Sequence, residues 1–393
     1  MSKTLKPSIR FKGFNEDWEQ RKLGDLVDVC SGRDYKHLSE GTIPVYGTGG
    51  YMLSVSEALS YDEDAIGIGR KGTIDNPYIL KAPFWTVDTL FYAIPRENVA
   101  LNFAFDLFQK IDWKKKDEST GVPSLSKATI NDIDVLTPKY NEQQIIGTYF
   151  KQLDHLITLH QRKYDKFLNI KKSMLEKMFP CVGKNVPEIR FAGYTEDWEQ
   201  RKLGETDTYF TDGNYGEAYP KASDMTDSGS GVPFLTGGNL KNGQLDLKGA
   251  NYITLEKHMK LTSGHLFEDD IVIAVRGSLG ALGYVNKGNS GWNINSQLAI
   301  LRTDKSVLNG KYLIQFLLSD TGQKDLLSKQ TGSALKQLPI TAVKDISVPL
   351  TSIEEQEAIG LFFANLDNLI TLHQREVEKL QNIKKSCLKK MFV

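Results

Sequence analysis

The side chains best suited to chemistry in this sequence are basic, hydroxyl and amide groups on glycine-rich turns. The first half carries YGTGG at 46–50 and GRKGT at 69–73, and the second half carries TGGNLK at 236–241 and RGS at 276–278. Glycine lets a backbone approach a phosphate closely, and arginine and asparagine side chains form paired hydrogen bonds with guanine or adenine edges. For any one of these residues the alternative is a solvated surface turn. The candidate contacts with nucleic acid are Tyr46, Thr48, Arg70, Lys71, Thr73, Thr236, Asn239, Lys241, Arg276, Ser278, Asn293 and Asn295.

Patterns associated with catalysis are incomplete in this chain. Gly67, Gly69 and Gly72 fit the dinucleotide-binding pattern G-x-G-x-x-G, but the TIDNP that follows cannot begin the helix that this motif needs. The DNPY at 75–78 is similar to an amino-methyltransferase signature, but it lacks the second proline and a glycine-rich strand before it. Glu-x-Lys, the dipeptide of a common nuclease core, does not occur, and the six histidines have neither metal-ligand nor triad spacing. The sequence therefore predicts no catalytic residues, no metal site and no cofactor bound by this chain.

The overall charge runs against a nucleic-acid partner. The chain has 393 residues, with 49 Lys plus Arg and 49 Asp plus Glu, so its formal net charge is zero. A basic footprint is expected of a nucleic-acid-binding domain, yet residues 26–140 carry 12 basic and 16 acidic side chains. Local cationic patches, or positive charge on partner proteins, would have to supply the attraction to phosphate.

Cysteine and apolar content indicate a cytoplasmic protein. Cys30, Cys181 and Cys387 are isolated, which excludes a zinc cluster and a disulfide framework. No apolar run approaches the roughly 18 residues of a membrane span, and the N-terminal MSKTLKPSIRF has no apolar signal core. We expect a cytoplasmic chain with two large domains and no contact with a membrane.

An internal repeat organises the whole chain. Residues 9–25 and 189–205 share 13 of 17 positions, and residues 142–179 and 355–392 share 24 of 38, whereas the segments between them differ. This order indicates a tandem duplication with pseudo-twofold symmetry, in which two variable domains stand on a constant frame. The expected divisions are a first domain at 1–140, a central helical arm at 141–180, a linker at 181–188, a second domain at 189–351 and a C-terminal helical arm at 352–393.

The two arms have the heptad pattern of a coiled coil. Apolar residues recur in strict steps of four and three, which predicts a helix–helix seam. A parallel pairing would put Lys171 against Lys384, so we expect antiparallel arms in which Lys171 lies near Leu366, His160 lies near Val377, and the lysines extend outward to water. The seam residues are Ile146, Phe150, Leu153, Ile157 and His160 in the first arm and Ile359, Phe363, Leu366, Ile370 and His373 in the second.

The variable domains have the pattern of mixed α/β units. Short apolar runs such as AIGIG, FWTVDTLFYAI, IVIAVRG and QLAILR are separated by glycine and asparagine turns, which is typical of short strands. Residues 102–111 and 312–327 are predicted to be helical, and Trp18 and Trp198 of the repeated EDWEQRKLG are expected to be packing residues. The expected fold class is α+β, with two mixed α/β domains joined by two long helices that form an antiparallel coiled coil.

This combination resembles the specificity subunit of type I restriction-modification enzymes. The resemblance is carried by EDWEQRKLG at the start of each half, by GRKGT and RGSLG within the variable domains, and by EQQIIGTYFKQLDHLI and EQEAIGLFFANLDNLI at the start of the arms. Each motif alone is weak, but their duplicated order around dissimilar domains is specific. The resemblance covers essentially the whole chain.

The resemblance implies a DNA-binding subunit that acts in host defence. It implies two target-recognition domains, each reading one half of a bipartite site in double-stranded DNA. The arms would act as a spacer and as the docking surface for two methyltransferase subunits, which two restriction and translocation subunits then join. The subunit itself would be non-catalytic, and S-adenosylmethionine, ATP and Mg would be bound by the partner subunits.

Two other interpretations of the residues remain open. A coiled-coil scaffold that binds only proteins would explain the arms, but it gives no reason for divergent domains on identical frames. A self-contained DNA methyltransferase or nuclease would need a cofactor loop or metal-binding carboxylates, which the sequence does not supply.

Overall fold

The protein is described by a computed structural model that covers residues 6–181, 183–333 and 335–392. Residue 182 of the expected linker, residue 334 of the expected second domain and both chain ends lie outside the described residues. The chain divides into two units, of which unit 1 holds the residues up to Arg162 and from His373 onward, and unit 2 holds Lys163–Leu372. No helix in the described part of the chain is long and apolar enough to cross a bilayer.

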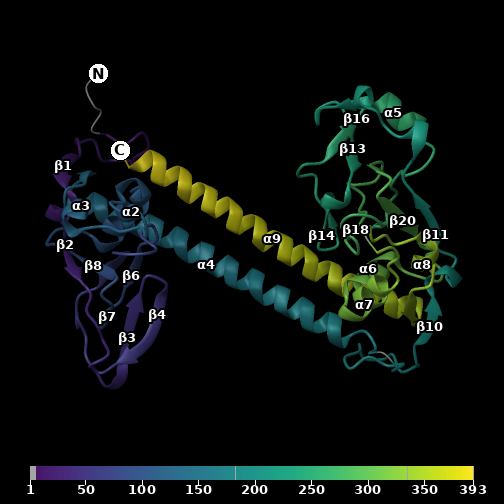
Figure 1. The fold of residues 1–393 in the computed structure, drawn as a ribbon, viewed down its shortest axis with the longest axis horizontal. Coiled ribbons are helices and arrows are strands. Elements are labelled where there is room, and N and C mark those ends of the chain that lie inside the picture. Colours follow the sequence, from purple (N-terminus) through teal and green to yellow (C-terminus); the bar gives the residue numbers. More distant parts are fainter. Residues whose placement is uncertain (1–5, 182, 334, 393) are drawn as a thin grey trace. The chain divides into compact units, whose positions relative to one another are not determined.

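Unit 1 is built on two sheets and a short antiparallel ribbon (Figure 1). The four-stranded sheet has the order β2 (Val27–Ser31), β8 (Leu90–Pro95), β5 (Ala65–Gly69) and β6 (Tyr78–Leu80). The three-stranded sheet has the order β4 (Gly50–Val55), β3 (Glu40–Gly47) and β7 (Trp85–Thr86). The ribbon pairs β1 (Glu19–Lys22) with β9 (Asp134–Thr137), and the short helices are α1 (Leu23–Leu26), α2 (Leu101–Lys110) and α3 (Lys127–Asn131).

Unit 2 repeats this plan with additions. Its first four-stranded sheet has the order β11 (Tyr209–Asp212), β20 (Leu298–Arg302), β17 (Ile271–Ala274) and β18 (Leu282–Tyr284). Its second has the order β12 (Met225–Thr226), β16 (Asn251–Ile253), β13 (Val232–Leu235) and β19 (Asn293–Ile294). Two ribbons pair β10 (Glu199–Lys202) with β21 (Ser347–Leu350) and β14 (Leu240–Lys241) with β15 (Gln244–Leu245). The short helices are α5 (Leu255–Lys260), α6 (Gly310–Leu318), α7 (Asp320–Ser328) and α8 (Ile340–Lys344).

The expected elements are present, with two revisions. The run FWTVDTLFYAI forms two strands, β7 and β8, rather than one. The helix expected over 312–327 is interrupted at Ser319, whose side chain caps the N-terminus of α7 by accepting a hydrogen bond from the Gly322 amide at 3.1 Å. A serine that bonds the backbone ahead of it favours a new helix start over continuation of the old one.

The two long helices are α4 (Tyr140–Lys177) and α9 (Ile353–Met391), and within each unit their segments pack antiparallel (Figure 1). In unit 1, the Tyr149 hydroxyl lies 3.6 Å from Sγ of Cys387, and Nζ of Lys384 donates to the Asp154 carboxylate at 2.5 Å. In unit 2, Lys171 donates to Asp367 at 2.6 Å. The coiled coil expected from the heptads, with the antiparallel orientation expected from the seam lysines, is therefore the observed fold.

Two side chains of this coiled coil behave differently from the prediction. Lys171 is buried and paired with Asp367 instead of extending to water. His160 makes a contact that was not expected: its Nδ1 lies 3.0 Å from Nδ1 of His373, so one ring donates to the other. Near the middle of an antiparallel pair, a residue also faces its own counterpart, and a His–His contact therefore does not distinguish the two orientations.

The repeated frame motifs join each domain to the first turn of its long helix. In unit 1 the Arg10 guanidinium forms two hydrogen bonds of 2.7 Å with Glu142, and in unit 2 Arg190 binds Glu355 at 2.7 and 2.8 Å. Both pairs are largely buried, and in each of them the hydrogen bonds to the carboxylate raise the pKa of the arginine. The identity of residues 9–25 with 189–205 thus reflects one contact made twice.

The glutamine after each of these glutamates completes the junction. Gln143 accepts a hydrogen bond from the Ala100 amide, which lies just before α2, and donates to the carbonyl of Pro138. Gln356 makes the same bonds in unit 2, accepting from Asn309 before α6 and donating to Thr351. One side chain thereby links the start of the long helix to the start of the helix that covers the sheet.

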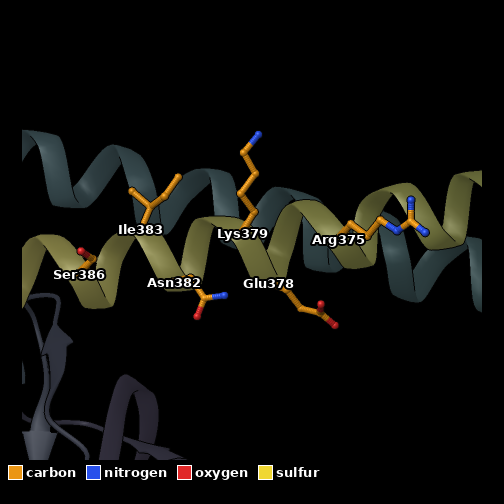
Figure 2. A pocket seen from close by; sticks show the side chains of 6 residues that line it. All are labelled: Arg375, Glu378, Lys379, Asn382, Ile383 and Ser386. Atoms are coloured by element: carbon orange, nitrogen blue, oxygen red, sulfur yellow. The ribbon is translucent and has the colours of Figure 1, made fainter. Parts of the chain in front are cut away.

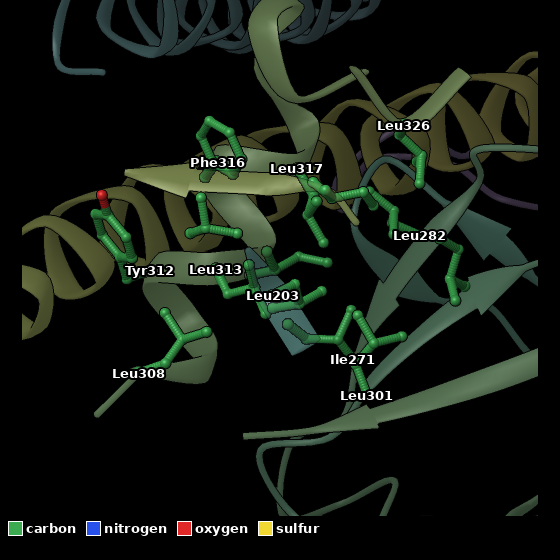
Figure 3. Packing of buried hydrophobic residues seen from close by; sticks show 14 of the residues in the cluster. Leu203, Ile271, Leu282, Leu301, Leu308, Tyr312, Leu313, Phe316, Leu317 and Leu326 are labelled. Carbon is green, nitrogen blue, oxygen red and sulfur yellow. The ribbon is translucent and has the colours of Figure 1, made fainter. Parts of the chain in front are cut away.

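An aromatic side chain at the end of each long helix completes a domain core. After the end of α4, Phe179 packs in unit 2 against Trp198, Tyr312 and Phe363, with ring centroids 6.4, 5.4 and 6.2 Å away. Figure 3 shows Tyr312 with the leucines and isoleucines of the same core.

Unit 1 contains the same arrangement at the end of α9. Phe392 packs against Trp18, Phe103 and Phe150 at centroid distances of 6.0, 5.5 and 5.9 Å. Trp18 and Trp198 are both buried, in agreement with their expected packing role. Each domain core therefore includes a phenylalanine from the arm of the other repeat.

The two phenylalanines can be tested separately because each belongs to one unit. Phe392→Ala should destabilise unit 1, and Phe179→Ala should destabilise unit 2. In each case we expect the free energy of unfolding to fall by about 3–5 kcal/mol, because a large cavity replaces a well-packed ring. Hydrogen exchange measured by mass spectrometry on β5 and β17 would locate the loss.

The control for this experiment is Leu361→Ala, at a leucine of α9 that is 57% exposed, for which we expect a change within about 0.5 kcal/mol. Faster exchange in the wrong unit, or none in either, would contradict the packing role of the two rings.

The buried ion pair of each frame should matter more than exposed pairs. Glu355→Gln leaves the Arg190 guanidinium buried without a countercharge, so we expect a loss of about 3–5 kcal/mol in the unfolding free energy of unit 2. Asp345→Asn is the matched control, because the Lys202–Asp345 pair is 2.9 Å long but both side chains are 56% exposed, so we expect a much smaller loss of stability there. Similar urea midpoints for the two variants would refute this assignment.

Candidate nucleic-acid interface

In unit 1 the glycine-rich turns of the sequence meet at one edge of the sheets. Strands β3 and β7 are parallel and therefore end together, where the Val87 amide donates to the Tyr46 carbonyl at 3.0 Å. The turn after β7 leads to β8, and the Arg70 amide at the end of β5 donates to the carbonyl of Thr89 at 2.8 Å. We call the group formed by residues 47–50, 70–73, 86–89 and 118–124 loop cluster 1.

Unit 2 builds the same arrangement from equivalent strands. Strands β13 and β19 are parallel, and the Asn295 amide donates to the Leu235 carbonyl at 2.9 Å. The Arg276 amide donates to the carbonyl of Gln297 at 3.2 Å. A methyl group added to Gly237 would lie 3.3 Å from Cβ of Ser278, so these two turns are in contact. Loop cluster 2 comprises residues 236–239, 276–280, 295–297 and 331–337, described apart from residue 334.

The strand register determines which basic residues correspond. Gly69 pairs with Leu90 and Ala274 with Leu298, so the residues two positions after each strand end, Lys71 and Arg276, are the structural equivalents. Lys71 and Arg276 also make the same β-bridge, with Ser124 and Gln337 respectively.

Arg70 is thus one residue out of register with Arg276, although both guanidiniums reach the same place. Arg70 donates to the carbonyl of Asp88 at 3.2 Å, and Arg276 donates to the equivalent carbonyl of Ser296 at 3.3 Å. Arg276 also lies over the ring of Tyr215, 5.5 Å from its centroid. Arg70 and Arg276 therefore correspond in the position of the guanidinium and not in the backbone.

Several of the sequence-predicted contact residues are accessible at these edges. Arg70, Lys71, Thr73, Lys241, Arg276 and Ser278 are exposed, and Tyr46, Thr48 and Thr236 are half-buried. Lys241 donates to Asp246 at 2.6 Å, and this hydrogen bond lowers the pKa of the aspartate. Lys71 forms no ion pair within the described part of the chain.

Three predicted asparagines are buried and bond to the protein itself. The Asn239 side chain accepts from the amide and hydroxyl of Thr236 at 2.9 and 3.0 Å, and it donates to the carbonyl of Asp246 at 2.9 Å. This pattern holds the turn in shape and leaves no face for a base. We therefore remove Asn239 from the proposed contact set.

Asn293 and Asn295 are also removed. Asn293 lies between two histidine rings, 2.6 Å from Nδ1 of His258 and 3.0 Å from Nδ1 of His265. Asn295 accepts from the amide of Gln297 at 3.0 Å and thereby shapes the turn before β20. Asparagine suggested base recognition because of its amide group. In the structure both side chains are buried in the protein, and no local pattern in the sequence indicates this.

The loops 118–124 and 331–337 are parts of the two clusters that residue types did not single out. Loop 118–124 is closed by a hydrogen bond from the Glu118 amide to Ser124, and loop 331–337 by a reciprocal pair between Thr331 and Gln337. Each loop leads into a buried leucine, Leu125 or Leu338, that anchors it to the sheet. The constant offset of 213 residues in this region is the sequence signal that could have identified them.

Two hollows on unit 1 lie outside the loop clusters. One of about 650 Å³ is lined by the repeated frame and the start of α4, including Arg10, Arg21 and Lys139. The other, of about 550 Å³, is lined by residues of α9 alone, and Figure 2 shows its side chains pointing in different directions from the helix. Among the described residues, no three His, Cys, Asp or Glu side chains are placed to hold a metal ion.

Comparison with known proteins identifies a family. A family model described as a type I restriction modification DNA specificity domain matches residues 15–168 and again residues 195–382. The MjaVIII type I restriction enzyme specificity subunit of Methanocaldococcus jannaschii is 21% identical over 407 residues, which cover 95% of this chain and 91% of that protein. The EcoBI specificity subunit of Escherichia coli is 23% identical over 292 residues, covering 70% of this chain and 60% of that protein.

A solved structure shares the fold. The S subunit of the type I restriction-modification system from M. genitalium superposes with a TM-score of 0.67 at 16% identity, over 99% of both chains. The matched family is the specificity component of these systems, which is non-catalytic, so this chain provides DNA sequence specificity in a restriction-modification system. Both repeats of the sequence match the family model, and the chain belongs to the family of type I restriction-modification DNA specificity subunits.

Proposed function

We propose that this chain reads a bipartite site in double-stranded DNA, with loop cluster 1 on one half-site and loop cluster 2 on the other. The observation that carries this proposal is the repetition of one loop edge on equivalent strands with different side chains. Tyr46 in β3 and Thr48 in loop cluster 1 correspond by register to Leu235 in β13 and Gly237 in loop cluster 2. A constant scaffold with variable loops suits two readers that recognise different bases.

The proposed contact set follows from accessibility. It comprises Thr48, Arg70, Lys71 and Thr73 in loop cluster 1 with Tyr46 of the adjoining β3, and Thr236, Arg276 and Ser278 in loop cluster 2 with Lys241 of β14. Arg276 and Lys71 stand where a phosphate or a guanine edge could be approached from solvent. The domain boundaries expected from the sequence are also part of this proposal.

The partners belong to the proposal as well. We infer that the chain works in the cytoplasm with two methyltransferase subunits and two restriction and translocation subunits, which bind S-adenosylmethionine, ATP and Mg. The frame motifs share 13 of 17 positions and the long helices 24 of 38 between the repeats, as expected of surfaces that bind two copies of one partner.

A protein-binding scaffold without DNA recognition is the competing function. Gel-shift titration of the assembled complex with genomic fragments and with random duplexes separates the two. Sequence preference that disappears when the specificity chain is omitted supports DNA recognition, and equal binding of all duplexes would favour the scaffold.

The two readers should be exchangeable one at a time. Replacing residues 26–124 with the corresponding segment of a relative should change one half of the methylated sequence and leave the other half intact, because the frame and arms are untouched. Methylome sequencing of a host that carries the exchanged gene is the measurement. A change in both halves, or in neither, would mean that the domains do not read independently.

Lys71 and Arg276 should each account for about one phosphate contact. In the assembled complex, Lys71→Ala and Arg276→Ala should weaken binding to all sequences and reduce the slope of log affinity against log salt by about one. Lys81→Ala is the control, since this exposed lysine is already paired with Asp64.

A different result would assign a different role to the two cations. A loss of about 1–3 kcal/mol confined to one base position would identify a base reader. Unchanged affinity and slope for both variants would return these residues to solvated surface turns.

A further inference from the structure

Each loop cluster carries an exposed aliphatic side chain at the tip of a loop. Val122 is 56% exposed and Leu335 is 89% exposed. Single exposed apolar residues are common on protein surfaces, so exposure alone decides nothing. The distinguishing feature is that the same position is aliphatic in both units although the loops, ESTGVPS and TGSALKQ, otherwise differ.

The two tips occupy equivalent places. Loop 118–124 and loop 331–337 have the same length, each is closed between its first and last residues, and the aliphatic residue is the fifth in both. The residue pairs that close the loops and the tips themselves are all related by 213 positions.

A cation stands at the foot of each tip. In unit 1 the Gly72 amide donates to the Pro123 carbonyl at 2.8 Å, and Lys71 forms a β-bridge with Ser124. In unit 2, Arg276 forms the corresponding bridge with Gln337.

The backbone after each loop is tied to the sheet. The Leu125 amide donates to Arg70 and the Leu338 amide to Val275, both at 2.9 Å, and the two leucine side chains are buried. The loop bases are therefore fixed to the ends of β5 and β17.

This pairing of an aliphatic tip with a fixed cation matches the surface of a DNA duplex. Phosphates border the grooves, and the stacked bases between them are the apolar part of the molecule. Proteins that kink or open a duplex insert Leu, Ile, Met, Phe or Pro side chains between base pairs, and contacts to the adjacent phosphates hold them in place.

We propose that Val122 and Leu335 are wedges that enter the base stack of the two half-sites, at the steps whose phosphates are held by Lys71 and Arg276. The inference rests on the proposed function, because it assumes that the loop clusters face DNA. It adds that the chain unstacks its site as well as reading it, which would lower the cost of taking a base out of the duplex for a partner that modifies it.

Permanganate probing of the assembled complex on its methylated sequence tests the wedge. Permanganate oxidises unstacked thymines, so both strands are probed and each half-site is examined separately. We expect reactive thymines in both half-sites. Leu335→Ser should abolish only those in the half-site read by unit 2, and Val122→Ser only those in the other.

Two controls separate the wedge from general effects of the substitution. Leu335→Met keeps an apolar side chain and should retain the reactivity. Leu255→Ser changes a leucine on α5 that is 62% exposed, and it should leave both half-sites as in the wild type.

A second measurement follows from the cost of unstacking. Leu335→Ser should bind the intact duplex about tenfold more weakly than the wild type, and an abasic position at the reactive step should remove most of that difference, because the stack is already open there.

The outcomes distinguish the wedge from the proposed function. Sequence-specific binding without reactive thymines, or reactivity that survives both serine substitutions, overturns the wedge and leaves DNA recognition standing. If the serine variants bind DNA normally but fail to assemble with the methyltransferase subunits, the tips contact protein and the wedge is likewise wrong. If the wild-type complex has no sequence preference, the proposed function itself fails.

Discussion

The packing of one phenylalanine at the end of each long helix is the contact on which the architecture depends. Phe392 lies among Trp18, Phe103 and Phe150 in unit 1, and Phe179 has the corresponding neighbours in unit 2. Each ring comes from the arm of the other repeat, so neither core is complete without both arms. Because interiors are close-packed, an absent ring leaves a cavity that the neighbouring side chains fill only partly. The repeats are therefore stabilised as a pair, and this links the duplication to the stability of the fold.

The same constraint explains which residues are repeated and which are not. The arginine–glutamate pairs, the tryptophans and the glutamines that join the helices make corresponding contacts in both units, and a change there leaves a buried charge or a gap. The loop clusters lie at strand ends, where few side chains are buried and the backbone pairing of the strands sets most positions. Gly47 and Thr236 are equivalent in register although their side chains differ. Variation is thus concentrated where the fold tolerates it.

The sequence predicted the long-range periodic features better than the local ones. Heptads predict the two helices and their coiled-coil contact because the apolar period is set by helix geometry over many turns. The antiparallel orientation was predicted from the positions of Lys171 and Lys384 in the seam. Whether Asn293 faces a base or two histidines depends on tertiary neighbours that no local pattern encodes. The register of Lys71 with Arg276 was missed for a related reason, since it follows from the pairing of β5 with β8 and of β17 with β20. The glycine-rich turn suggested Arg70 because the sequence shows the residue types of the turn but not the pairing of the strands beside it.

The zero net charge is compatible with DNA recognition once individual pairs are considered. Many acids of the first domain are already engaged by lysines: Asp75 binds Lys114 at 2.7 Å, and Lys22 binds both Asp132 and Asp134. Lys71 has no such partner within the described residues, so its charge is available to a ligand at the foot of its loop. Screening limits attraction to roughly 8–10 Å at physiological salt. A phosphate at the loop edge therefore responds to nearby cations far more than to the sum over the chain.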